Sequence, residues 1–215
     1  MDIDVALSDE EEETLTAQQV LEALESAWLN EKFSPELLPH NIELVECMLE
    51  QIQQMEENLQ KSRPDDLRVS IHRMELDRIR YLVTSYLRTR LEKIEEYTVD
   101  ILEKDSQRDP ESSYLSPGER KFAREYLEHM ENHFRVLALR HMPPNLQDFD
   151  KVKMRVVPNL DCHIFLRANK TVNGVVIEGD TENGDEEVDL EENSQHIILY
   201  SSVAELVKNR TVQLI

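Results

Sequence analysis

The chain has 215 residues, 40% of them hydrophobic, which is enough for one good core or two small ones. Its 45 acidic residues outnumber 24 basic ones and give a formal net charge of -21, so the phosphates of a nucleic acid would repel the chain as a whole. The sequence contains no apolar run of the roughly 20 residues that span a bilayer, and its acidic start is unlike a signal peptide, so we expect a soluble intracellular protein with no membrane partner.

The first 15 residues predict a disordered acidic tail. Residues 1–13 contain seven acids and no base, a composition typical of a solvated segment. The apolar residues Ile3, Val5 and Leu7 alternate with the acids, which leaves a short partner-binding peptide as an alternative to a purely solubilising tail.

Residues 16–147 have the pattern of a helical bundle. Thr16 and Gln19 have the spacing of a capping box, and the apolar residues that follow recur at helical spacing, which predicts a first helix near 17–31. An amphipathic stripe predicts a second helix that ends near Lys61.

A third helix of unusual length is expected over residues 66–103, which contain neither Gly nor Pro. At about 1.5 Å per residue it would be roughly 55 Å long, more than a compact domain of this size needs for its own core. Its apolar residues cover more than one stripe of helix surface, which indicates burial on at least two sides. The helix is therefore central in a bundle, and a partner subunit on its second side is a compatible addition.

A fourth helix is predicted to begin at Ser116-Pro117-Gly118-Glu119 and to run to about His141. Ser116 supplies an N-cap, Pro117 suits the first helical position and Glu119 completes a capping box. The proline pair Pro143-Pro144 closes the helical region.

The pattern changes after a linker over residues 148–160, and residues 161–215 predict a small β-rich second domain. Short β-branched segments alternate with Asn-Gly, Gly-Asp and acidic turns. The expected strands are 163–167, 175–178, 187–190, 195–200 and 211–214. Residues 200–209 predict one short helix capped by Ser201 or Ser202. The fold class is thus mainly α with a small β-rich second domain.

Catalytic chemistry has little support in the sequence. Glu125, His129 and His133 lie four residues apart on one helical face, but Met130 follows the first His where a zinc metalloprotease has its Glu base, so a solvated polar face is favoured over a metal site. With only four Gly residues, a glycine-rich phosphate loop is not available. Cys47 and Cys162 lack the paired spacing of a zinc site or disulfide framework and are expected to be reduced packing residues. We expect no enzyme activity, no metal and no cofactor.

A basic stretch interrupts the acidic background. Residues 68–93 contain seven basic residues against three acids. Internal ion pairs and contact with an acidic partner both explain such a helix, since Arg is favoured for bidentate carboxylate pairing at interfaces. Direct DNA contact is the least favoured alternative, because exposed aromatic residues for base stacking are not interleaved with the cations.

Several stretches resemble one family. AWLNEKFSPELL, RIRYLVTSYLRTRLEKI, LSPGERKFAREYLEHMENHF and the final TVQLI occur in order between about Ser26 and Ile215, and together they resemble the Sld-five subunits of GINS. The resemblance implies a helical A-domain followed by a β-rich B-domain. It also implies a heterotetramer with three Psf subunits, which joins the Mcm ring and a RecJ-like co-activator in the nucleus to form the CMG replicative helicase. ATP hydrolysis would belong to the Mcm ring.

The resemblance also predicts a subunit interface on the long helix, the first helix and the closing strand. The residues expected there are Trp28, Leu82, Tyr86, Leu87, Arg88, Leu91, Val212, Leu214 and Ile215. The acidic tail would be a docking peptide for a replisome hub, and the chain alone would bind DNA little or not at all. The alternative from a different class is an acidic nuclear chaperone or adaptor that binds basic partners, which the charge alone suggests.

Overall fold

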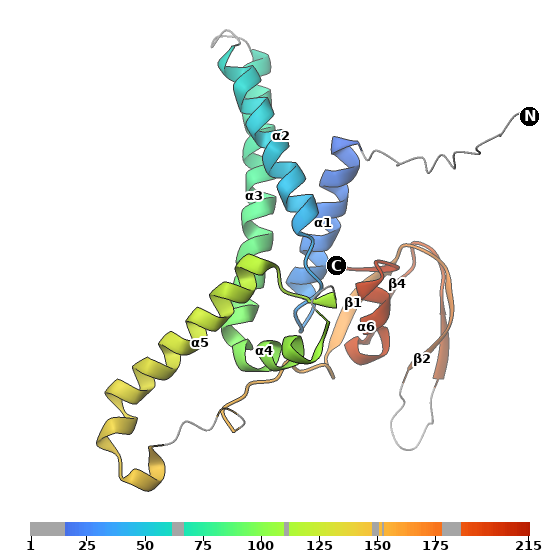
Figure 1. Ribbon diagram of the computed structural model, residues 1–215. Helices are drawn as coiled ribbons and strands as arrows, with labels where there is room; N and C mark the ends of the chain where they lie inside the picture. The colour runs from blue at the N-terminus through green and yellow to red at the C-terminus, as the bar shows by residue number, and fades with distance from the viewer. Residues whose placement is uncertain (1–15, 62–66, 110–111, 148–150, 152, 178–185) are drawn as a thin grey trace, which may run out of the picture.

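A helical region precedes a small β-rich region, as predicted (Figure 1). The computed structural model describes residues 16–61, 67–109, 112–147, 151, 153–177 and 186–215. The helical elements are α1 (Ala17–Phe33), α2 (Ile42–Gln60), α3 (Leu67–Glu96), α4 (Thr98–Gln107), α5 (Pro117–Leu137) and the 3-10 turns η2 (Leu139–His141) and η3 (Pro144–Leu146). The remaining elements are β1 (His163–Ala168), β2 (Val172–Ile177), β3 (Glu186–Leu190), β4 (Gln195–Leu199), α6 (Tyr200–Lys208) and β5 (Val212–Leu214).

Helices α1, α2 and α3 pack together around one apolar core. Leu24 of α1, Val45 and Met48 of α2, and Val83 and Tyr86 of α3 are all nearly inaccessible to solvent. The capping box predicted at the start of α1 is present: the Gln19 backbone N–H donates to the Thr16 hydroxyl, and the Gln19 side chain accepts from the Thr16 N–H. The start of α1 is therefore specified by residues of its own first turn.

The single helix expected over residues 66–103 is wrong, because the helix breaks at Tyr97. The Thr98 hydroxyl donates to the carbonyls of Ile94 and Glu95, a side-chain bond that competes with the helical ladder and bends helices. After the break α4 turns, and its apolar residues pack on a second core that contains Ile94 and Leu115. With 30 residues, α3 is about 45 Å long rather than about 55 Å.

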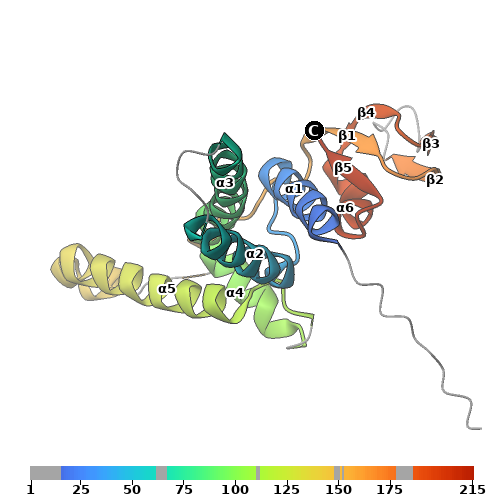
Figure 2. The same cartoon turned by 90° about the horizontal axis from the view of Figure 1, so that it is seen from above.

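Helix α5 begins as predicted. The Glu119 N–H donates to the Ser116 hydroxyl, and the Ser116 N–H donates to the Glu119 carboxylate at 2.9 Å. Only Ala123 of this helix is fully buried, and the second half of α5 projects away from the other helices in both views (Figures 1 and 2). The α-helix ends at Leu137, and the 3-10 turn η2 covers the last residues of the predicted span.

The β-rich region contains two antiparallel sheets. One has the strand order β4-β1-β5, with Phe165 paired with Ile197 and Leu166 paired with Leu214; the other pairs β2 with β3. The inner face of the first sheet packs on α6. The predicted Ser201 or Ser202 cap of α6 is wrong: the helix starts at Tyr200, and the backbone N–H groups of Tyr200 and Ser201 donate to the carbonyls of Cys162 and Leu160, just before β1.

The two regions meet at the end of α1 and the segment after it, residues 34–41. The Leu214 N–H donates to the buried Asn30 side-chain oxygen at 2.8 Å, the Tyr200 hydroxyl donates to Glu36 at 2.9 Å, and Leu38 belongs to the core of the β-rich region. Seen from above, α1 lies between α2 and α3 on one side and β5 and α6 on the other (Figure 2). Helix α1 thus connects the two regions.

Candidate subunit interface

A buried charge network sets the position of α3 against its neighbours. The Arg90 guanidinium donates to Glu31 of α1 at 3.0 Å, to both carboxylate oxygens of Glu119 at 2.7 and 3.0 Å, and to two backbone carbonyls. One turn further along, the Lys93 ammonium donates to Glu31 and to the Ser34 hydroxyl. The side chains of Arg90 and Glu31 are each only 1% exposed, so the pair has essentially no solvent around it.

Titration behaviour in this network follows from burial and its partners. Burial alone would lower the pKa of Arg90, but the hydrogen bond to Glu119 and the charge of Glu31 outweigh it and hold that pKa above its ordinary value. Burial would raise the pKa of Glu119, but the hydrogen bond from Arg90 and its positive charge lower it overall. Burial lowers the pKa of Lys93, against the opposing effect of Glu31. The network therefore holds a charged Arg90 and Glu119 inside the protein.

The opposite face of α3 carries large apolar side chains that this chain leaves largely exposed. Its residues alternate at spacings of four and three, the repeat with which a helix packs against another helix. They are Leu67, Ile71, Met74, Arg78, Tyr81, Ser85 and Arg88, which we call the α3 stripe. Leu67 and Met74 are 73% exposed and Tyr81 is 61% exposed.

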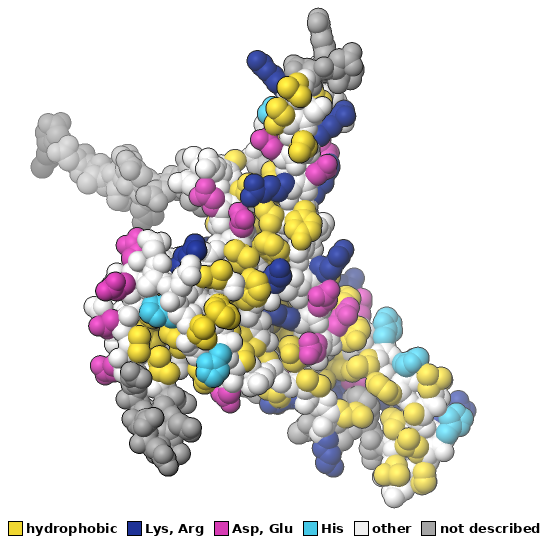
Figure 3. Space-filling model, turned by 180° about the vertical axis from the view of Figure 1, so that it is seen from behind, with side chains coloured by type: hydrophobic (Ala, Val, Ile, Leu, Met, Phe, Trp, Pro, Cys, Tyr) yellow, Lys and Arg dark blue, Asp and Glu magenta, His cyan; other side chains and the backbone are white. Residues whose placement is uncertain are grey.

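The apolar surface continues from α3 onto α1. The Trp28 ring packs edge-on against the Tyr81 ring at 6.2 Å between centroids, and its Nε1–H donates to the Ser85 hydroxyl at 3.0 Å. The Lys32 ammonium lies 5.2 Å from the centroids of both Trp28 and Phe33. From behind, hydrophobic side chains run along the upright α3 column and continue toward the β-rich region (Figure 3). Such a continuous exposed apolar surface is typical of a protein that binds another protein.

Some of the residues predicted for the interface are buried within the chain, and others keep exposed surface. Leu82 and Tyr86 face the core of the chain itself, and the Tyr86 hydroxyl accepts from the Asn41 N–H at 3.2 Å. Val212 and Leu214 are fully buried between the sheet and α6. These four side chains stabilise the fold and are not accessible to a partner.

The other predicted residues keep some surface. Trp28, Leu87 and Leu91 are half-buried, Arg88 is exposed, and Ile215 is 44% exposed. Ile215 lies at the outer face of the first sheet with Phe165 and Ile197, where an open hollow of about 380 Å³ is present. Leu67, Ile71, Met74 and Tyr81 were missed as site residues, although their four-three spacing could have identified them.

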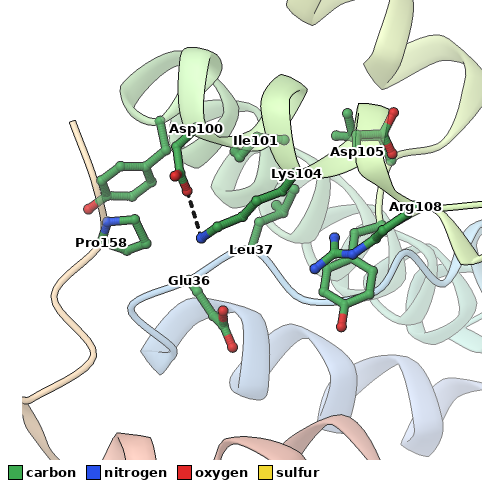
Figure 4. A pocket seen from close by; sticks show the side chains of 11 residues that line it. Glu36, Leu37, Asp100, Ile101, Lys104, Asp105, Arg108 and Pro158 are labelled. Carbon is green, nitrogen blue, oxygen red and sulfur yellow. Dashed lines mark ion pairs between the residues drawn. The ribbon is translucent and has the colours of Figure 1, made fainter. Parts of the chain in front are cut away.

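A pocket between α4 and residues 36–37 is small and is lined by both charged and apolar side chains (Figure 4). It encloses about 30 Å³, roughly the size of a water molecule and far below a typical small-molecule site. Lys104 pairs with Asp100 at 2.8 Å, one turn away on the same helix, and Pro158 closes one side of the pocket. Arg155 also pairs with Asp100, at 3.3 Å, so this region attaches the segment before β1 to α4.

The residues considered for metal binding lie on the exposed surface of α5. Glu125 pairs with Lys121 at 3.8 Å, and the His133 ring packs edge-on against Phe134. Within the described ranges, no group of three His, Cys, Asp or Glu side chains is arranged to hold a metal ion. Cys47 and Cys162 are both free and half-buried. None of the described helices combines the length and apolar character needed to cross a membrane.

A helical bundle that leaves an apolar helix face uncovered and carries a small docked sheet is the architecture of an assembly subunit. Comparisons with known proteins agree. A family model described as "GINS complex protein helical bundle domain" matches residues 42–138, and one described as "DNA replication complex GINS protein SLD5 C-terminus" matches residues 158–215.

Relatives similar over nearly their whole length carry the same description. The chain is 50% identical to the "DNA replication complex GINS protein SLD5" of Rattus norvegicus over 212 residues, covering 97% of this chain and 95% of the relative. It is 48% identical to the protein of that description from Homo sapiens, with 95% and 93% covered, and 31% identical to the one from Arabidopsis thaliana, with 94% of each covered. The chain belongs to the SLD5 family of GINS proteins.

Proposed function

We propose that the chain is a non-catalytic scaffold subunit of the GINS heterotetramer and acts in the nucleus. In this proposal it assembles with three Psf subunits, and GINS joins the Mcm ring and a RecJ-like co-activator to form the CMG helicase for chromosomal replication. The observation that carries the proposal is the α3 stripe with its extension onto α1, an apolar helical surface that the chain leaves open. Family membership supports it.

The α3 stripe suits a permanent rather than a passing contact. Leu67, Ile71, Met74 and Tyr81 would each contribute about 1.5–3 kcal/mol if fully removed from water, and obligate interfaces resemble a domain core cut in half. Arg88 within the same stripe supplies a charge that can pair with a carboxylate of a partner, whereas Arg78 already pairs with Glu25 of α1 at 3.7 Å. Such an interface resists salt, because most of its stabilisation is apolar.

A scaffold role would require no catalytic chemistry from this chain. ATP hydrolysis would be supplied by the Mcm ring, so this chain needs no cofactor. The net charge of -21 disfavours direct DNA binding by the chain alone. The acidic tail lies outside the described residues, and its role as a docking peptide for a replisome hub stays a prediction; a pull-down with a peptide of residues 1–13 that recovers nothing specific would remove it.

The test is the mass of the complex in solution at high salt after co-expression with the three Psf proteins of the same organism. We expect a stable one-to-one-to-one-to-one complex, which Ile71→Asp with Met74→Asp should abolish because two carboxylates would be buried in an apolar contact. Gln53→Asp, on the exposed surface of α2, is the matched control and should leave assembly intact.

A well-behaved monomer that ignores the Psf proteins would refute the scaffold proposal. Salt-sensitive binding to basic proteins would then favour the acidic chaperone. Deleting Thr211–Ile215 should also lose the tetramer, but Val212 and Leu214 are core residues, so that deletion removes part of the fold as well as the exposed Ile215. The substitutions on the α3 stripe separate assembly from folding more cleanly.

A further inference from the structure

The far end of α5 forms a second surface that the α3 stripe does not include. From Asn132 to Leu137 every residue of α5 is exposed, and the chain then folds through η2 and η3 (Figure 1). Residues 132–147, which we call the α5 arm, project from the helical region on the side away from the sheets (Figures 1 and 2). The arm therefore contributes little to the core of the chain.

The α5 arm exposes several large apolar side chains close together. Leu137 is 63% exposed, Leu146 is 57% exposed and Val136 is 52% exposed; Phe134 and Met142 are each more than two-fifths exposed. In Figure 3 the arm is the lower right projection, where hydrophobic and His side chains share the surface. An arm that is only a solvated extension would not need this apolar content.

The charge of the arm is opposite to that of the chain. Residues 132–147 contain Arg135, Arg140 and two His but no acid, whereas the whole chain carries -21. Neither Arg135 nor Arg140 forms an ion pair with any residue in the described part of the chain. Even with Asp148 and Asp150, which lie outside that part, residues 132–153 hold four Lys or Arg against two Asp.

The cations exceed what the helix end requires. A helix C-terminus attracts positive charge within its last turn, and Arg135 alone is placed there to satisfy it. Arg140 and His141 follow the helix in η2, beyond that turn. The surplus of positive charge beside exposed apolar side chains needs a different explanation.

We propose that the α5 arm is a docking surface for an acidic segment of another chain, one that brings apolar side chains to Val136, Leu137 and Leu146 and carboxylates to Arg135 and Arg140. Arg is suited to this pairing, because its guanidinium binds a carboxylate through two parallel hydrogen bonds. The proposal commits to another chain rather than the acidic tail of this one, because α1, which follows that tail, begins on the opposite side of the molecule from the arm (Figures 1 and 2). Apolar contacts favour a protein over a nucleic acid.

The test is site-specific photo-crosslinking of the full chain in the cells it comes from, with a photoreactive amino acid at position 136. The matched control carries the same group in place of Leu49, an equally exposed apolar residue of α2 that lies between Glu46 and Glu50. We expect a position 136 crosslink, identified by mass spectrometry, to a segment of another chain with net negative charge and apolar residues. Arg135→Glu with Arg140→Glu should lower its yield about tenfold or more, while Arg124→Glu should not.

Several results would overturn the proposal. One is a crosslink yield at position 136 no higher than at position 49, or unchanged by the double Arg substitution. Another is a crosslink to this chain's own tail, to a nuclease-sensitive nucleic acid, or to a partner segment without net negative charge. The mass of the complex with the Psf proteins, measured in parallel, distinguishes failure of the α5 arm proposal from failure of the scaffold proposal. An intact tetramer without the arm crosslink would refute only the α5 arm proposal, and a parent chain that forms no tetramer with the Psf proteins would refute only the scaffold proposal.

Discussion

Replacing Arg90 by Leu tests whether the buried charge network holds the helical region together. The substitution removes five hydrogen bonds and leaves the Glu31 carboxylate, 1% exposed, and the Glu119 carboxylate, 10% exposed, without their shared partner. Removing one member of a buried ion pair costs about 3–5 kcal/mol when an uncompensated charge stays buried. Here that charge is the Glu119 carboxylate, because Glu31 keeps its ion pair with Lys93. In a chain of this length, 1 kcal/mol corresponds to about 2–4 °C, so the melting temperature should fall by about 6–20 °C.

The assay is thermal unfolding of the full chain followed by far-UV circular dichroism. Arg88→Leu is the matched control, because Arg88 lies half a turn away on the exposed side of α3 and should change stability by no more than about 0.5 kcal/mol. If Arg90→Leu costs less than about 1 kcal/mol, solvent or a local rearrangement compensates Glu31 and Glu119, and the reasoning from burial is wrong.

Three smaller predictions concern the caps and the contact between the two regions. Because the pKa of Glu119 is lowered in the folded state, the ionised carboxylate stabilises the fold fully above its ordinary pKa of 4.5, and this stabilisation is lost as the pH falls through the lowered pKa. In urea unfolding at acid pH, the free energy of unfolding of Glu119→Gln should therefore fall less steeply with decreasing pH than that of the parent chain. Tyr200→Phe removes the hydrogen bond to Glu36 and should cost about 1–2 kcal/mol, with faster hydrogen exchange in α6 and β5 if the contact holds the regions together. Ser116→Ala removes the cap of α5 and should cost about 1 kcal/mol in urea unfolding, and a neutral result would mean that Glu119 alone fixes this helix start.

Features that depend on neighbouring residues were predictable from the sequence. The capping boxes at Thr16 and Ser116 lie where the sequence predicts them, because each is complete within four residues. The predicted side-chain cap of α6 was wrong, because the backbone N–H groups of Tyr200 and Ser201 donate to the carbonyls of Cys162 and Leu160, some 40 residues earlier. Local side-chain chemistry cannot report such a partner.

The candidate interface likewise depends on contacts between residues that are far apart in the sequence. The sequence pattern pointed to the helix that carries the exposed α3 stripe, but the direction in which its apolar residues face depends on where α1 and α2 pack. Tyr86 packs in one core with Leu24 and Met48, and Leu82 is also buried, so both are used internally, while Met74 and Tyr81 are left outside. The break at Tyr97 was equally hidden, because α4 turns toward a core that is partly supplied by Leu115 and α5.

Leu38 makes the core of the β-rich region depend on the helical region. This residue belongs by sequence to the helical region, yet it completes the core around Tyr200 and Val203, and Asn30 caps the backbone of the edge strand β5. A fragment that begins at residue 158 would lose both. The small sheet is therefore not a transferable module that evolution or an engineer can move to another protein unaltered; whatever bundle carries it must also supply an equivalent of residues 30–38.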